Sequence, residues 1–297
     1  MHLPDGFLSA PVWASLDVAA IPAVGYAVRR AQAGFDESRV PLLGVMGAFV
    51  FAAQMITFPV GVGTSGHLVG GALLAFTLGP AAAGVVMSAI LAIQALVFQD
   101  GGILALGSNV VNMAMVGVLA GYLPFHLWGS GKRRRFAIFT GGLLSVLVSA
   151  VLALSELLIS GVRMPGSVLG VSLGLFLVSA VLEGAITLAV VEALESIQPG
   201  FVRQPAPGRS FALGAVSLAA VLMAAAGTLF ASTNPDVIEK LAAQIGITAR
   251  EKVLVAAPLP DYQSPWLGKA GAGLAGLMMI YAACLLLGRL VARKRSV

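Results

Sequence analysis

Apolar stretches of about 20 residues recur along this chain, and they constrain its fold more than any other feature. A helix of that length crosses the ~30 Å hydrocarbon core of a bilayer. The mean hydropathy is +0.95, and 58% of the residues are hydrophobic while only 10% are charged, which is typical of an integral membrane protein. We predict an all-α membrane protein with spans near residues 11–29, 40–60, 67–79, 81–99, 103–127, 136–160, 167–194, 210–230 and 266–288. The third is short and glycine-rich, and we expect a broken or partly inserted helix there.

The distribution of basic residues between the predicted loops indicates the orientation. If the N-terminus lies outside, few of the 18 lysines and arginines fall on the outer side: Arg163, Lys240, Arg250, Lys252 and Lys269. The others, including the Lys132–Arg135 run, fall on the opposite side, as the positive-inside rule requires of cytoplasmic loops. We therefore predict nine crossings of a bacterial inner (cell) membrane, with the N-terminus outside and the C-terminus cytoplasmic. Because the basic charge belongs to these loops, no nucleic-acid partner is expected.

The first residues lack the basic region that begins a cleavable signal peptide. Arg29 and Arg30 follow the first apolar stretch and do not precede it. Removal of Met1 is also expected to be slow, because the second residue, His2, is large. We expect the chain to keep the terminal amine on Met1.

That expectation matters because a histidine at position 2 can bind a metal ion through three nitrogens: the α-amino group of Met1, the His2 backbone amide and His2 Nδ1. The fused chelate rings are flat, which favours ions that accept square-planar nitrogen ligands. His67 could provide a fourth nitrogen, since an ionisable ring entering a membrane span is costly and is usually functional. Four nitrogens without a thiolate suit Ni(II), Co(II) or Cu(II) better than Zn(II). We predict a metal site of Met1, His2 and His67; the alternative is a chance histidine behind an initiator methionine.

Polar side chains near these residues are candidates for a supporting role. Metal-bound histidines usually donate their second ring nitrogen to an acceptor, which amides or hydroxyls could provide. The candidates are Gln54, Ser65, Ser108, Asn109 and Asn112. Hydrogen bonding between helices explains them equally well.

Two phosphate-binding patterns around Gly61–His67 are rejected. Gly61-x-Gly63-x-x-Gly66 fits a dinucleotide fingerprint, and Gly61-x-x-x-x-Gly66-His67 resembles a P-loop. Neither follows a predicted strand in a βαβ unit, and His67 replaces the P-loop lysine. No set of nucleophile, base and orienting residue is readable either. The residues therefore indicate a metal-binding membrane protein without a readable catalytic site.

A Pro/Gly-rich polar stretch after residue 197 is typical of a linker. We predict a metal-capturing domain over 1–196, a cytoplasmic linker over 197–209, and a second domain over 210–297. The second domain would contain two membrane helices flanking an outer loop at roughly 231–265. In that loop, 237–245 is predicted as an amphipathic helix with Asn234 or Asp236 at its start.

Several motifs together resemble one family of membrane proteins. They are Met1-His2-Leu3-Pro4-Asp5-Gly6-Phe7-Leu8-Ser9, Phe51-Ala52-Ala53-Gln54-Met55-Ile56, Gly63-Thr64-Ser65-Gly66-His67, and Asp100-Gly101-Gly102 through Gly107-Ser108-Asn109-Val110-Val111-Asn112-Met113. Over residues 1 to about 195, the chain resembles the substrate-capture (S) component of nickel/cobalt energy-coupling-factor (ECF) transporters of the NikM/CbiM type. The tail is similar to the small companion subunit of NikN type, here fused. Its Pro-Asp-Val-Ile-Glu departs from the usual Pro-Asp-Gly-Leu-Glu, and Thr57 stands where asparagine is more usual.

The resemblance implies a seven-helix S-component bundle followed by two further membrane helices. It implies the same four nitrogens from Met1, His2 and His67, and it adds partners: a transmembrane coupling (T) subunit and two cytoplasmic ATPase subunits. The implied function is high-affinity capture of Ni(II), or Co(II), for ATP-driven uptake. The resemblance thus implies a transporter subunit and not an enzyme, with no cofactor and with the metal ion as its cargo. Four alternatives stay open: a cobalt-specific component for cobalamin synthesis, a stand-alone metal permease, a membrane hydrolase using Ser65 or Ser108 with His67, and a structural subunit without a ligand.

Overall fold

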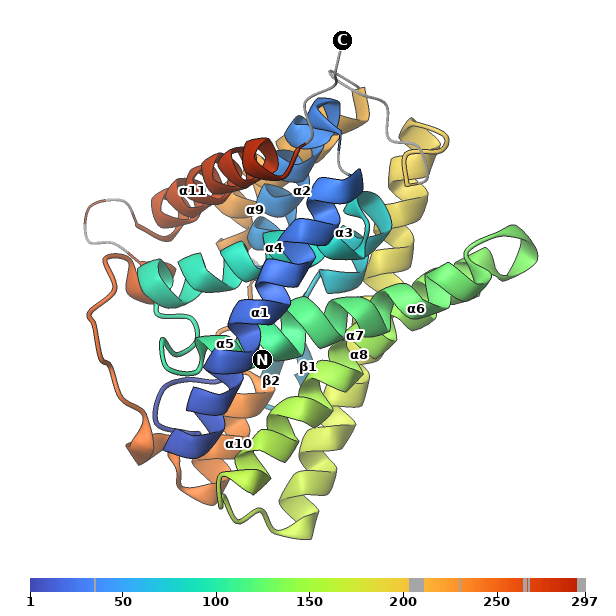
Figure 1. Ribbon diagram of the computed structural model, residues 1–297. Coiled ribbons are helices and arrows are strands. Elements are labelled where there is room, and N and C mark those ends of the chain that lie inside the picture. Colours follow the sequence, from blue (N-terminus) through green and yellow to red (C-terminus); the bar gives the residue numbers. More distant parts are fainter. Residues whose placement is uncertain (35, 203–210, 230, 264–265, 267, 293–297) are drawn as a thin grey trace.

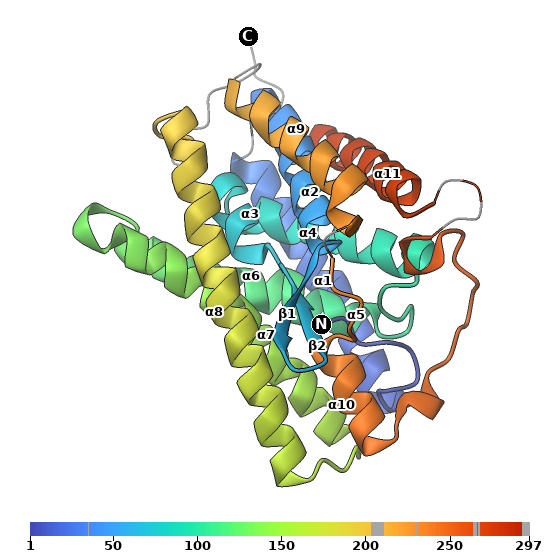
Figure 2. The same ribbon diagram turned by 180° about the vertical axis from the view of Figure 1, so that it is seen from behind.

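The computed structural model describes residues 1–34, 36–202, 211–229, 231–263, 266 and 268–292. These residues are mostly helical, with one two-stranded hairpin among them (Figures 1 and 2), which confirms the predicted all-α membrane fold. Among them, six helices are long and apolar enough to cross a membrane, and Phe211–Ala226 is a shorter apolar helix. Residues 203–209 of the predicted linker and the basic residues at 293–295 lie outside the described part of the chain.

The helical segments follow the predicted order of seven plus two. The first seven are α1 (Ala10–Gly34), α2 (Val40–Gln54, after the 3-10 turn η1, Glu37–Arg39), α3 (Gly71–Leu78), α4 (Pro80–Ile93, continued by the π-helical η2, Gln94–Phe98), the continuous α5–η3–α6 (Leu106–Asn109, π-helical Val110–Gly117, Val118–Trp128), α7 (Arg134–Ile159, after η4, Gly131–Arg133) and α8 (Gly166–Ile197). The tail contains α9 (Phe211–Ala226), η5 (Gly227–Leu229), α10 (Val237–Ile245), η6 (Thr248–Arg250), η7 (Pro260–Tyr262) and α11 (Gly268–Val291).

The second predicted span, 40–60, is wrong at its outer end. α2 ends at Gln54, and the chain then forms a two-stranded antiparallel hairpin of β1 (Thr57–Gly61) and β2 (Thr64–His67), with Thr57 opposite His67. Pro59 cannot continue the helix, and the glycines that follow favour a tight turn. The third predicted span shrinks to the eight residues of α3, which rise only about 12 Å. This confirms the expected broken segment.

A buried carboxylate on α8 joins the hairpin to α3. The Glu183 side chain is fully buried, and its two oxygens accept hydrogen bonds from the N–H groups of Val69 and Gly70, each at 2.8 Å. The first N–H groups of a helix have no partner within the helix, and the positive end of the helix dipole favours a carboxylate there. Glu183 therefore fixes the chain between His67 and α3.

The tail helices α9 and α11 pack against α2 and complete the bundle. Glycines make this approach close. A Cβ on Gly47 would lie 2.6 Å from Cys284 Sγ, and one on Gly276 would lie 2.5 Å from Phe51 Cζ. Such small residues let membrane helices pack with their backbones close together, so the tail is part of one helical assembly with the first domain.

Different helix ends and loops lie at the two ends of the molecule. Near the last turn of α11, Gln32 Nε2 donates to the Leu290 carbonyl at 3.2 Å, and in the same region Arg39 Nη2 donates to the Thr77 carbonyl at 2.9 Å. The N-terminus lies beside β1, β2 and α5, and α10 lies at the opposite end of the molecule from the last turn of α11 (Figures 1 and 2). This grouping agrees with the predicted sides of the loops, while the orientation across the membrane stays a prediction.

Replacing Glu183 with leucine removes both acceptors from the N–H groups of Val69 and Gly70. Each buried donor left without a partner costs about 1–3 kcal/mol, so we expect the melting temperature of the purified protein to fall clearly. The matched control is Glu192→Leu on the same helix, where an exposed ion pair with Arg135 at 2.7 Å contributes little. Equal melting of the two variants would contradict the role given to Glu183.

Candidate metal centre

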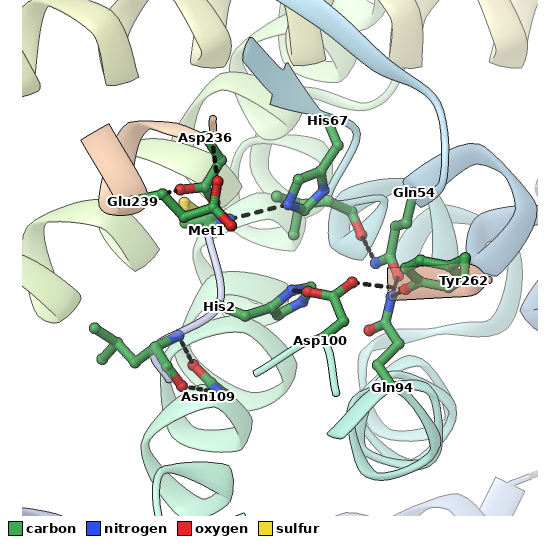
Figure 3. Close-up of polar contacts among 12 residues, drawn as sticks. Met1, His2, Gln54, His67, Gln94, Asp100, Asn109, Asp236, Glu239 and Tyr262 are labelled. Carbon is green, nitrogen blue, oxygen red and sulfur yellow. Dashed lines mark hydrogen bonds and ion pairs between the residues drawn. The ribbon is translucent and has the colours of Figure 1, made fainter. Parts of the chain in front are cut away.

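The N-terminal residues enter the bundle and are held there through their main chain (Figure 3). Leu3 N donates to Asn109 Oδ1 at 2.9 Å, and Asn109 Nδ2 donates back to Leu3 O at 3.1 Å. Gly102 N donates to the same carbonyl at 2.9 Å. Met1, His2 and Leu3 are all buried. The position of the terminus is thus set by backbone contacts to α5 and to the loop before it.

Asp5 anchors the other end of this segment. Its carboxylate accepts the N–H groups of Ile103, Leu104 and Ala105 at 2.9, 2.7 and 3.1 Å. A Cβ on Gly102 would lie 2.2 Å from Asp5 Oδ1, so only glycine lets the loop lie against the segment. Asp5 and Gly6 form a turn, with Gly6 at φ +92°, a conformation that glycine adopts readily.

The terminal amine lies between His67 and Asp236 (Figure 3). Met1 N is 3.0 Å from His67 Nε2 and forms an ion pair with the Asp236 carboxylate. His67 Nδ1 lies 2.9 Å from the Leu68 carbonyl, which can only accept, so Nδ1 carries the proton and Nε2 presents its lone pair to the amine. Burial and the neighbouring amine lower the pKa of His67 to about 4. The ring is therefore neutral at neutral pH, the form that a metal ligand needs.

The His2 ring stacks on His67, with ring centroids 5.3 Å apart and an interplanar angle of 22°. His2 Nδ1 lies 2.6 Å from Asp100 Oδ1, and the Tyr262 hydroxyl donates to Asp100 Oδ2 at 2.6 Å. Within the described residues, His2 Nε2 is buried without a hydrogen-bond partner. The structure thus brings Met1, His2 and His67 together, and carboxylates contact the amine and His2 Nδ1.

Both carboxylates carry a negative charge at neutral pH. Burial raises the pKa of Asp100, but the His2 ring and its hydrogen bond outweigh burial, so the pKa lies well below its usual value. Burial likewise raises the pKa of Asp236, and the terminal amine more than offsets it, so that this pKa is also lowered. Burial and the Asp100 charge raise the pKa of Tyr262 well above its usual value, so its hydroxyl stays a donor.

The five candidate supporting residues have partners other than the histidine rings. Gln54 donates to the Val69 carbonyl at 2.8 Å and accepts from Gln94 at 2.9 Å. Ser65 Oγ donates to the Asn234 carbonyl at 2.7 Å. Ser108 and Asn112 both donate to Glu156, the latter at 3.0 Å, and Asn109 holds Leu3 as described above. The ring nitrogens instead face the Leu68 carbonyl and Asp100, so these five side chains fix the surrounding backbone.

Asp236 performs two tasks, of which the sequence indicates one. One oxygen accepts the Glu239 N–H at 2.8 Å while Glu239 accepts the Asp236 N–H at 2.8 Å. This capping box begins α10 at Val237 and confirms the predicted helix and its cap. The other oxygen contacts the terminal amine, which the sequence does not predict.

The tail reaches the site because residues just before α10 pair with the hairpin. Ser65 N donates to the Pro235 carbonyl at 2.9 Å, and Ser232 N donates to the Thr57 carbonyl at 2.9 Å. Lys240 Nζ donates to the Val62 carbonyl at 2.6 Å. The only sequence signal for Asp100 lay in the Asp100-Gly101-Gly102 motif, and nothing in the sequence pointed to Tyr262. His126 is exposed on α6, away from this cluster.

Comparisons with known proteins agree on one class. Residues 2–201 match the family described as the cobalt uptake substrate-specific transmembrane region. The chain is 34% identical over 294 residues to a protein of Archaeoglobus fulgidus named as a fused nickel transport protein, NikMN, covering 95% of this chain and 96% of that protein. It is 32% identical over 208 residues to the cobalt transport protein CbiM of Acetoanaerobium sticklandii, covering 67% of this chain and 86% of that protein. The crystal structure of a truncated transition metal transporter has a TM-score of 0.58 and 31% identity, covering 66% of this chain and 99% of that one.

Replacing Asp5 with alanine leaves three backbone N–H groups without their acceptor. We expect the N-terminal segment to loosen and the affinity for Ni(II) to fall about 10- to 100-fold, the range seen when groups supporting metal ligands are lost. The control is Asp17→Ala, which removes the hydrogen bond from Gly107 N to Asp17 Oδ1 at 2.7 Å and touches none of the contacts of Met1 to Asp5. Titration of the purified protein with Ni(II) measures both. Wild-type affinity in the Asp5 variant would show that this anchor does not shape the site.

Proposed function

This chain belongs to the family of cobalt-uptake substrate-specific transmembrane proteins, and from that premise we propose that it captures Ni(II) outside the cytoplasm for ATP-driven uptake. The family and its named relatives establish metal transport. The observation that carries the finer proposal is the 3.0 Å approach of the terminal amine to His67 Nε2, with the His2 ring stacked on His67.

The proposed ligands are the Met1 amine, the His2 backbone amide, His2 Nδ1 and His67 Nε2. The Leu68 carbonyl supports this assignment, because it holds the proton on His67 Nδ1 and leaves Nε2 free to bind. In this structure, Asp236 and Asp100 contact the amine and His2 Nδ1. Capture therefore exchanges two carboxylate contacts for bonds to the metal, and the amine and the amide lose protons in the process.

The preference for nickel follows from the flat chelate. Ni(II) accepts a square-planar set of nitrogens readily, whereas Co(II) accepts nitrogens without requiring that plane. Relatives that match along most of this chain are named for nickel in one case and for cobalt in another, so the preference rests on the chelate. A cobalt-specific component for cobalamin synthesis is the competing assignment.

We further propose that the chain works as the S component of an ECF transporter, with a T subunit and two ATPase subunits. The absence of a P-loop lysine in this sequence agrees with ATP hydrolysis on other chains. The proposed division is a capture domain at 1–196, a linker at 197–209 and a companion domain at 210–297, with the N-terminus outside and the C-terminus cytoplasmic. Metal uptake by cells that express this chain without any ATPase would favour a stand-alone permease instead.

Adding two residues before Met1 converts the terminal amine into an amide. We expect such an extension to weaken Ni(II) binding by more than about 100-fold, because one ligand is lost and the chain no longer ends inside the bundle. His67→Ala should weaken binding similarly without lowering the helical content. The control carries the same two residues after Val297. Isothermal titration with Ni(II) gives the affinities, and unchanged binding by the extended protein would rule out the amine as a ligand.

The ligand set also predicts selectivity. Protein with a native N-terminus, incubated with equal amounts of Ni(II) and Co(II) and then desalted, should retain mainly nickel. Elemental analysis of the bound metal measures the ratio. Retention of mainly cobalt would support the cobalt-specific assignment.

A further inference from the structure

A polar cavity of about 500 Å³ adjoins the cluster of Met1, His2 and His67. His2 and His67 line its inner end, and exposed residues of the tail, including Glu251, Asp261 and Lys269, line its outer part. The cavity therefore connects the proposed metal ligands with the surface of the tail segment that lies over them.

The tail part of this cavity's lining is rich in carboxylates, whereas Asp100 and Asp236 at the inner end are paired with His2 and the terminal amine. Among the described residues it contains five carboxylates, from Asp100, Asp236, Glu239, Glu251 and Asp261, and a single ammonium group, from Lys269. Four of the five carboxylates belong to the tail. Clefts lined by one sign of charge concentrate counter-ions and speed their association.

The inner end of the cavity carries a group that lacks a partner. His2 is 7% exposed, and its Nε2 is buried without a hydrogen bond in the described part of the chain. Asp100 and Asp236 lie beside the same cluster, in contact with His2 Nδ1 and the terminal amine (Figure 3). Carboxylate oxygens can bind a hydrated divalent cation through their lone pairs and negative charge, whereas a protonated amine has no lone pair to offer.

We propose that this cavity is the path by which a hydrated divalent cation reaches the N-terminal nitrogens, drawn inward by the tail carboxylates Glu239, Glu251 and Asp261. The inference rests on the proposed function, since the cation is its proposed cargo. Asp236 and Asp100 then form the inner end of the path, where the cation exchanges water and carboxylate oxygens for nitrogens. The tail thus controls how fast the metal is captured, while the first domain holds it.

The outer part of the cavity carries both negative and positive side chains, so variants can test whether the association rate depends on the sign of the charge removed. One variant, Glu251→Gln with Asp261→Asn, removes two negative charges; asparagine tolerates the positive φ of 52° at position 261. A second variant, Lys269→Gln, removes the positive charge. All three side chains are exposed, so folding should be retained, which melting temperatures check. The control is Glu192→Gln at the far end of α8, which removes a negative charge away from the cavity.

The measurement is the association rate constant of Ni(II), followed by stopped-flow transfer from a coloured chelator to protein with a native N-terminus. At an ionic strength of about 0.01 M, where the Debye length is about 30 Å, we expect association to slow by about threefold for each carboxylate removed. Lys269→Gln should speed it by a similar factor, and the control should match wild type. At about 1 M salt, where the Debye length is about 3 Å, the differences should disappear.

Association rates that are equal in all four proteins at low salt would overturn the proposal, as would slower association in Lys269→Gln. Either result with intact Ni(II) binding leaves the proposed function standing and removes only the path. Failure of the wild-type protein to bind Ni(II) removes both.

Discussion

The main-chain clamp on Leu3 is the constraint on which the rest of the site depends. Asn109 bonds both the N–H and the carbonyl of Leu3, and Gly102 adds a second bond to that carbonyl. Because these contacts are made to the backbone of Leu3, they hold the first residues in place independently of the side chains of Met1 and His2. This position of Leu3 places the terminal amine beside His67. A chain terminus is usually mobile, and here it becomes a buried and positioned group.

Burying an amine and an imidazole has a cost that the structure offsets with carboxylates. An isolated charge in a low-dielectric interior is strongly unfavourable unless it is paired. Asp236 pairs with the amine, and Asp100 pairs with the His2 ring and is itself held by Tyr262. Two of these three groups come from the tail. The tail therefore stabilises the buried position of the amine and of the His2 ring.

Much of the fold could be predicted from the sequence, because hydropathy and capping act over short distances. The order of seven plus two helical segments and the helix at 237–245 with its Asp236 cap are confirmed. Sequence also pointed to Met1, His2 and His67 as one cluster, although their role as ligands stays a prediction. The predicted outer end of the 40–60 span was wrong because the residues of strand β1 around Pro59 are apolar and extend the hydrophobic stretch beyond the end of α2. The contacts of Asp100 and Tyr262 were out of reach, since 162 positions separate them and only the docked tail brings them together.

The most direct test of the central claim is the nickel K-edge X-ray absorption spectrum of the Ni(II)-loaded protein with a native N-terminus. Four nitrogen ligands in a plane, with no oxygen in the coordination shell, are the result that the account predicts. That outcome requires the amine and His2 Nδ1 to leave Asp236 and Asp100. A six-coordinate spectrum rich in oxygen would contradict it, because the metal would then be bound by the carboxylates and water and not by the chain terminus.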